Sequence, residues 1–186
     1  DEERYASHSV LAHGRWVKVR VAESGIHMFT HSQLQSMGFA DPTKVRLYGY
    51  GGHLLSESNV DSWCDDLCEV PLQRESDRML FYANGTVSWK LSSDNTFSHT
   101  RNPYSDYGYY FLTEDTVGAP AVVPVVDALL VPKSDTVATT PAYALHEVDE
   151  YAWLHGGRKL VENYDYTGVS SRRYSLATPG VYAQVC

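Results

Sequence analysis

Hydrophobic and polar residues alternate along most of the chain, and Gly, Pro, Asn and Asp interrupt the alternation at short intervals. This pattern is typical of β-strands joined by turns. Within residues 15–22, for example, Val17, Val19 and Val21 share one face and Lys18 and Arg20 the other. We expect this run to form a hairpin with residues 26–30 around a turn at Glu23-Ser24-Gly25.

A second hairpin is predicted where Asn84-Gly85 separates two alternating runs, residues 78–83 and 86–91. This dipeptide favours a type I′ turn, which needs positive φ at both central residues. Residues 45–50, 107–113 and 121–131 add further strand material. The expected fold is therefore mainly β, with antiparallel sheets in a sandwich or barrel-like arrangement and one or two short helices.

One short helix is expected directly after Thr30, which can cap it. Gln33 stands where a capping box places Glu or Gln. Leu34 and Met37 lie three apart on one face, and Gly38 suits the left-handed position that ends a helix. A second helix is expected at about residues 146–155.

A composition change divides the chain. Residues 132–142 are small and polar and are bracketed by Pro132 and Pro141, which is typical of a linker. We predict an N-terminal β domain at 1–142. Residues 143–186 then form a segment that leads towards a downstream domain and that can also pack on the first.

The charge balance excludes one class of partner. The 186 residues include 15 basic and 23 acidic side chains, a formal charge of −8, and such a surface repels nucleic acid. No membrane span is expected, since the longest apolar region, residues 119–131, is interrupted by Pro120, Pro124 and Asp127. The chain starts at Asp1, without Met or an apolar leader, as expected of a mature or trimmed N-terminus. This start fits an exported protein, and an artificially shortened chain would begin in the same way.

Neither a metal nor a cofactor is expected. An acidic loop could offer oxygen ligands to calcium, but its spacing does not match the Asp-x-Asp-x-Asp-Gly pattern, so we interpret it as solvated. Its members are Glu57, Asp61, Asp65, Asp66 and Glu69. The eight histidines form no His-Glu-x-x-His motif, and the three cysteines form no Cys-x-x-Cys motif.

Cysteines raise two further questions. Cys64 and Cys68 could close a small disulfide loop outside the cytoplasm, and the sequence leaves both outcomes open. Leu154-His155-Gly156-Gly157 together with Cys186 suggests a Cys–His catalytic pair. Such a pair needs both residues at the ends of buried strands, and neither strand is evident. We therefore assign no catalytic residue to this chain.

The fourteen tyrosines are the most unusual feature of the composition. Tyr104, Tyr107 and Tyr109 could form an aromatic surface that stacks on sugar rings. In alternating strands, however, half of such rings point into the core, and that interpretation is favoured. A free-standing glycan-binding β-module is nevertheless the alternative function.

Several stretches, taken in order, resemble the N-terminal region of gingipain-like cysteine peptidases, the type IX secretion sortase-like proteins of Bacteroidetes. The most specific is Asn102-Pro103-Tyr104-Ser105 followed by Tyr109-Tyr110-Phe111-Leu112. The other matching stretches are residues 11–26, 33–42, 45–52, 66–70, 81–89 and 146–158. The sequence departs from the family pattern at Cys68, where Pro is usual.

The resemblance implies a non-catalytic structural and docking domain that precedes a caspase-like catalytic domain. The parent protein would be an exported cysteine endopeptidase that cleaves sorting signals, located in the periplasm or on the outer-membrane surface of a Gram-negative bacterium. Implied partners are the downstream catalytic domain and outer-membrane proteins of the secretion system. The family's catalytic residues lie downstream, and no position here matches them.

Overall fold

The computed structural model describes residues 5–56, 58, 65–126, 144–152, 160–163, 167–168 and 170–176. The chain forms two compact units, Asp1–Val126 and Asp127–Cys186. All the named helices and strands belong to the first unit. The predicted linker at residues 132–142 lies outside the described residues.

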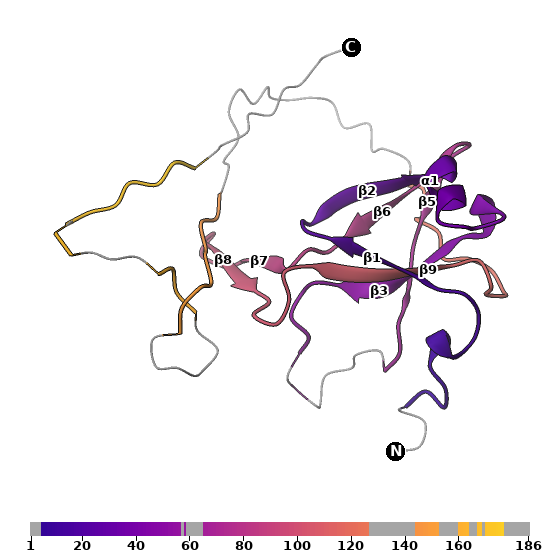
Figure 1. Ribbon diagram of the computed structural model, residues 1–186, viewed down its shortest axis with the longest axis horizontal. Coiled ribbons are helices and arrows are strands. Elements are labelled where there is room, and N and C mark those ends of the chain that lie inside the picture. Colours follow the sequence, from indigo (N-terminus) through magenta and orange to yellow (C-terminus); the bar gives the residue numbers. More distant parts are fainter. Residues whose placement is uncertain are drawn as a thin grey trace, which may run out of the picture. The chain divides into compact units, whose positions relative to one another are not determined.

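The first unit is built mainly from two antiparallel sheets, which Figure 1 shows as two layers. Sheet A has the order β1 (Val17–Val21), β9 (Gly108–Thr113), β3 (Arg46–Gly51) and β4 (Glu69–Val70). Sheet B has the order β2 (Gly25–Thr30), β6 (Arg78–Ala83) and β5 (Gln73–Arg74). The predicted mainly β fold is confirmed, and within the described residues it takes the sandwich form.

The core lies between the two sheets. Tyr110 of sheet A meets Phe81 of sheet B edge to face, with ring centroids 5.7 Å apart, and both are almost fully buried. Val17, Val19 and Val21 turn inward while Lys18 and Arg20 are exposed, as the alternation predicts. The other fully buried large residues are Leu34, Val45, Leu47, Leu72, Met79, Leu112 and Thr113.

The first predicted hairpin is wrong in its pairing. Both strands exist, but β1 pairs with β9 and β2 pairs with β6, so the turn between them carries the chain from one sheet to the other. The pairing differs from the prediction because β1 and β2 each have an apolar face that must be buried in the core. Val19 and Phe29 both pack on the same core cluster, as they do when their strands lie in opposite sheets.

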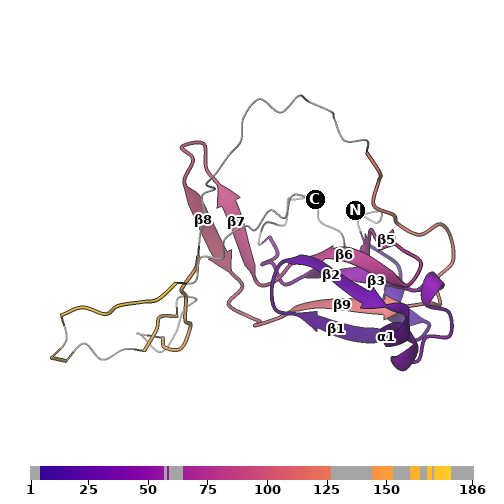
Figure 2. The ribbon, with the colours of Figure 1, turned by 90° about the horizontal axis from the view of Figure 1, so that it is seen from above.

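The second predicted hairpin is also wrong. Neither Asn84 nor Gly85 has a positive φ, so no type I′ turn forms. Instead β7 (Val87–Leu91) pairs with β8 (Phe97–Arg101) across a turn in which Asn95 has φ 61°. This ribbon extends away from the sandwich (Figure 2). Tertiary contacts of the Asn84 backbone, described below, override the local preference for a turn.

The first predicted helix is confirmed. In α1 (His31–Ser36), Thr30 and Gln33 form the full capping box, and Leu34 is completely buried. Gly38 takes φ 91°, and the Phe39 N–H donates back to the Leu34 carbonyl at 3.2 Å. Two short 3₁₀ helices, η2 (Val10–Ala12) and η3 (Pro42–Lys44), flank this part of the chain.

Two weaker predictions do not hold over the described residues. Residues 144–152 are not helical, and Tyr151 forms an antiparallel bridge with Val161 instead. Contacts of His146 with Glu162 and Tyr174 fix this segment without a helix. Within 121–126 only Val122 makes a bridge, parallel to Leu72, and residues 127–131 lie outside the described residues.

Candidate interaction surfaces

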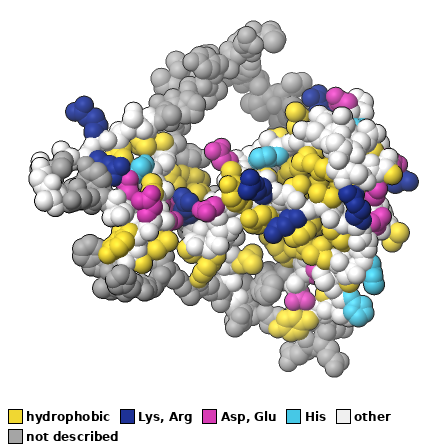
Figure 3. All heavy atoms as spheres, in the orientation of Figure 1, with side chains coloured by type: hydrophobic (Ala, Val, Ile, Leu, Met, Phe, Trp, Pro, Cys, Tyr) yellow, Lys and Arg dark blue, Asp and Glu magenta, His cyan; other side chains and the backbone are white. Residues whose placement is uncertain are grey.

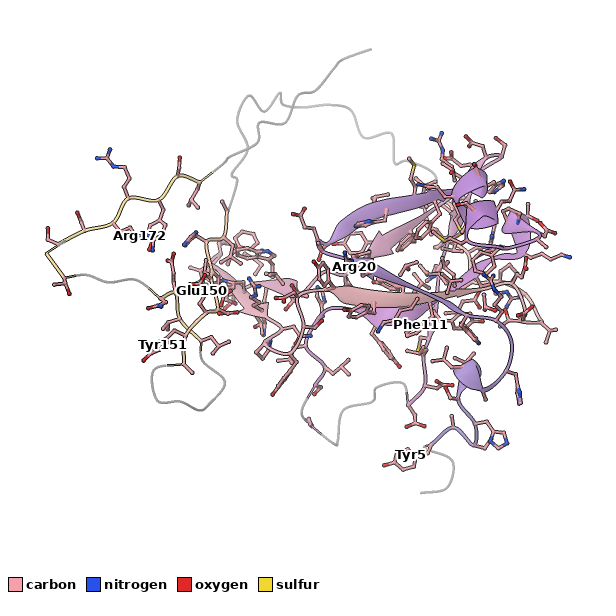
Figure 4. All side chains as sticks on the ribbon, in the orientation of Figure 1. Tyr5, Arg20, Phe111, Glu150, Tyr151 and Arg172 are labelled. Atoms are coloured by element: carbon pink, nitrogen blue, oxygen red, sulfur yellow. The ribbon has the colours of Figure 1, made fainter. Side chains whose placement is uncertain are left out.

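The outer face of sheet A combines aromatic rings with cationic side chains. Lys18 and Arg20 of β1 pair with Phe111 and Tyr109 of β9, so these side chains share one face. The Lys18 Nζ lies 3.9 Å from the ring centroid of Tyr109. Arg20 and Phe111 are labelled on these strands in Figure 4, and Figure 3 shows Lys and Arg side chains among hydrophobic ones on the sandwich.

The tyrosines predicted as an aromatic surface are only partly brought together. Tyr107 and Tyr109 are half-buried and line a pocket of about 310 Å³ with Tyr50. Tyr104 is 70% exposed and does not line it. One face of Tyr107 carries the Arg20 guanidinium, 4.5 Å from its centroid, as Tyr109 carries Lys18. Cation–π contacts therefore occupy ring faces that sugar stacking would use.

The outer face of sheet B exposes several large apolar side chains. Ile26 pairs with Tyr82 and Met28 with Leu80, which places all four on the outer side. Ile26 is 71% exposed, Tyr82 58% and Met28 51%. We call Ile26, Met28, Leu80 and Tyr82 the sheet B face. Adjacent exposed apolar side chains of this kind mark interaction sites.

Sequence reasoning missed the sheet B face because both faces of its strands are apolar. In β6, Met79 and Phe81 are buried, whereas Tyr82 is exposed. When the side chains on both faces of a strand are apolar, the alternation does not indicate which face enters the core. The signal available was the lack of charge at positions 79–82 and 26–29, next to the clear in–out alternation of β1.

The described members of the acidic loop bind protein groups. Asp66 accepts hydrogen bonds from the Ser9 hydroxyl and from the backbone N–H groups of Val10 and Leu67. Burial works to raise the pKa of Asp66, but these hydrogen bonds outweigh it and lower the pKa. Asp65 accepts from the Ala6 N–H at 2.7 Å. Glu57 and Asp61 lie outside the described residues, which contain no cluster that could hold a metal ion.

The cysteine predictions fall mostly outside the described residues, which include neither Cys64 nor His155 and Cys186. Cys68 is exposed, and its Sγ lies 3.9 Å from the Tyr50 hydroxyl. The Cys64–Cys68 disulfide therefore stays a prediction. No described helix is both long enough and apolar enough to cross a membrane.

A polar cluster joins three segments of the second unit. Glu162 contacts His146 Nε2 at 3.2 Å and the Tyr174 hydroxyl at 3.1 Å, and its other oxygen lies 2.7 Å from Arg172 Nη1. The hydrogen bond from His146, followed by those from Tyr174 and Arg172, lowers the pKa of Glu162. Tyr174 also stacks on His146, with centroids 4.3 Å apart.

The chain is similar to a protein of known structure. No family model matches the chain, and no curated protein does. Among solved structures, the chain is similar to the crystal structure of dimeric latent PorU from Porphyromonas gingivalis, with 37% sequence identity and a TM-score of 0.60. The likeness covers 78% of this chain and 12% of that chain.

The chain contains a PorU-related domain. Because the chain spans only about an eighth of PorU, most of the PorU polypeptide has no counterpart in these 186 residues.

Proposed function

We propose that this chain is a non-catalytic N-terminal structural and docking domain of an exported gingipain-like cysteine peptidase that acts in type IX protein secretion. The observation that carries the proposal is the 37% identity to PorU over 78% of the chain, combined with coverage of only 12% of PorU. The domain matches one part of a much longer protein, and the chemistry belongs to the rest of that protein.

The parent protein would be located in the periplasm or on the outer-membrane surface of a Gram-negative bacterium, where it cleaves sorting signals from secreted proteins. The domain's principal partner is then the downstream catalytic domain, and outer-membrane secretion proteins are further partners. Its work is to fold, to pack against that domain and to present a docking surface.

The sheet B face is the surface that suits the packing role. Ile26, Met28 and Tyr82 are each more than half exposed and adjoin one another across β2 and β6. Burying such apolar area against another domain is favourable by about 25 cal/mol per Å². The occupant we propose is the downstream part of the parent polypeptide.

A peptidase assay of the 186-residue chain tests the non-catalytic role. We expect no turnover of peptide substrates above that of a heat-denatured sample. Turnover that is abolished by Cys186→Ala would contradict the proposal. The matched control is Cys68→Ala, which leaves the terminal thiol in place.

A binding experiment tests the docking role. The chain is mixed with the separately produced downstream part of its parent, and complex formation is followed by sedimentation. Ile26→Lys and Met28→Lys should each weaken the complex, whereas Val125→Lys, at a residue that is 87% exposed, should not. Equal effects of the three substitutions would remove the sheet B face as the contact.

A glycan-binding module is the second candidate, because Tyr107 and Tyr109 line a pocket. Glycan-array binding that is lost in Tyr107→Ala and Tyr109→Ala, and kept in Tyr5→Ala, would favour it. An array without binding would remove it.

A further inference from the structure

A pocket at one end of the sandwich gathers cationic side chains from segments far apart in the sequence. Its volume is about 310 Å³, which is within the range of small-ligand sites. Lys44 ends η3, Arg46 begins β3, and Arg74 ends β5. The lining is completed by Thr43, Glu114, Thr116, Gly118 and Pro120.

Two polar atoms of this lining lack an acceptor or donor. Arg74 Nε and Thr116 Oγ1 are both buried, and neither has a hydrogen-bond partner among the described residues. An orphaned buried donor costs about 1–3 kcal/mol, and buried polar groups are otherwise almost always paired. Two such atoms in one pocket leave hydrogen-bonding capacity that the protein itself does not use.

The rest of each arginine is already held in place. Arg74 donates from Nη1 to the Thr43 carbonyl at 3.0 Å and from Nη2 to the Val45 carbonyl at 2.6 Å. Arg46 donates to the carbonyls of Val117 and Gly118. The guanidinium groups are thus fixed by backbone acceptors, which carry no full charge.

The nearby carboxylates are also committed. Glu114 accepts from the N–H groups of Ala40 and Asp41, at 3.0 and 2.9 Å. Glu69 accepts from the Ala121 N–H at 3.1 Å and lies 3.6 Å from Arg46 Nη1. Asp41 lies 3.6 Å from Lys44 Nζ at an exposed position. Three cations thus face three carboxylates whose acceptor oxygens are largely used.

We propose that this pocket binds a carboxylate, which accepts hydrogen bonds from Arg74 Nε and from the Thr116 hydroxyl. Arginine pairs well with both carboxylate and phosphate. The local charge balance favours a single negative charge, since a phosphate dianion would add two charges to a pocket that is close to neutral. The pocket volume of about 310 Å³ is roughly ten times the 30 Å³ that one water occupies, so acetate alone would not fill the pocket. A carboxylate carried on a peptide side chain therefore fits the pocket best.

The test is an NMR titration of the 186-residue chain, read on the arginine Nε–H signals. The Arg74 signal is assigned by its loss in Arg74→Lys. Sodium acetate, sodium phosphate and the peptides acetyl-Gly-Glu-Gly-amide and acetyl-Gly-Gln-Gly-amide are added at ionic strength held constant with NaCl. We expect saturable movement of the Arg74 signal with acetate and with the Glu peptide, and weaker movement with phosphate.

Two substitutions sharpen the result. Thr116→Val removes only the orphaned hydroxyl, so the fold should persist while carboxylate affinity falls roughly tenfold, the loss expected for a hydrogen bond to a charged group. Lys44→Gln should also weaken binding, and Lys90→Gln, an exposed charge change in β7, should not. Tighter binding of the Glu peptide than of acetate identifies a peptide-borne carboxylate, and the reverse identifies a free one.

The proposal is overturned if the Arg74 signal moves no more with acetate than with NaCl, which would mean that water alone fills the pocket. Equal binding of the Glu and Gln peptides, or tighter binding of phosphate than of carboxylate, would also overturn it. So would an unchanged affinity in Thr116→Val. None of these outcomes depends on the peptidase parentage of the chain.

Discussion

The hydroxyl of Tyr110 accepts a hydrogen bond of 2.8 Å from the backbone N–H of Asn84. Tyr110 belongs to β9 of sheet A, and Asn84 directly follows β6 of sheet B, so this bond links the two layers of the sandwich. The Asn84 carbonyl accepts from the Gly52 N–H at 2.9 Å, which adds the end of β3 to the same junction. Burial raises the pKa of Tyr110 above its ordinary value of 10.0, and the hydroxyl stays neutral at physiological pH.

Tyr110→Phe should lower the free energy of unfolding by about 1–3 kcal/mol, because the Asn84 N–H loses its partner in a partly buried place. Urea unfolding measures the change. Tyr104→Phe is the control, since Tyr104 is 70% exposed, and it should change stability by less than about 0.5 kcal/mol. A similar loss in both variants would show that the junction bond adds nothing specific.

Gly51→Ala should be more destabilising than Tyr110→Phe. A Cβ at Gly51 would lie 2.5 Å from the Asn84 carbonyl oxygen and 2.6 Å from the Tyr110 hydroxyl, and Gly51 has φ 79°. Left-handed backbone and overpacking together cost roughly 2–5 kcal/mol. Gly118→Ala shares the positive φ, 97°, but meets no atom within 4 Å. The difference in thermal midpoint between the two variants reports the crowding, and equal midpoints would contradict it.

Thr30→Ala should cost about 1 kcal/mol through loss of the helix cap. The Thr30 hydroxyl accepts from the Gln33 N–H at 3.1 Å, and the Gln33 side chain accepts in return from the Thr30 N–H at 2.9 Å. Thr30→Ser keeps the hydroxyl and should retain most of the stability. Chemical denaturation of the three proteins checks this order, and a Ser variant as unstable as the Ala variant would contradict the capping explanation.

The Glu162 cluster should loosen in acid. Hydrogen bonds from His146, Tyr174 and Arg172 lower the folded-state pKa of Glu162 below its ordinary value of 4.5. Because the depressed pKa belongs to the folded state, this stabilisation is present above pH 4.5 and is lost as the pH falls through the folded-state pKa. NMR shifts of the Tyr174 ring should follow that transition.

In Glu162→Gln the Tyr174 ring should no longer show this titration, whereas the exposed Glu150→Gln control should keep it. A titration that persists in Glu162→Gln would assign it to another group.

Local patterns in the sequence were sufficient for individual elements. The face of β1 follows from alternation, and the limits of α1 follow from Thr30, Gln33 and Gly38, because caps and alternation depend on residues within a few positions. Strand pairing was not predictable in the same way. Asn84-Gly85 has the composition of a tight turn, yet contacts from Gly52 and Tyr110, distant in the sequence, decide its conformation.

The candidate sites show the same limit. The sheet B face depends on which of two apolar sets enters the core, and a single strand does not contain that information. The cationic pocket joins Lys44, Arg74 and Thr116, which become neighbours only after both sheets have formed. The tyrosine cluster was found from composition, but the cations that cover its rings come from β1.

The pairing of β1 with β9 constrains the order of events as the chain leaves the ribosome. Val17 of β1 pairs with Leu112 of β9, so β1 cannot join sheet A until residues 108–113 have been synthesised. Until then the valines of β1 have no partner strand, and such long-range closure is slow and exposes apolar surface to aggregation.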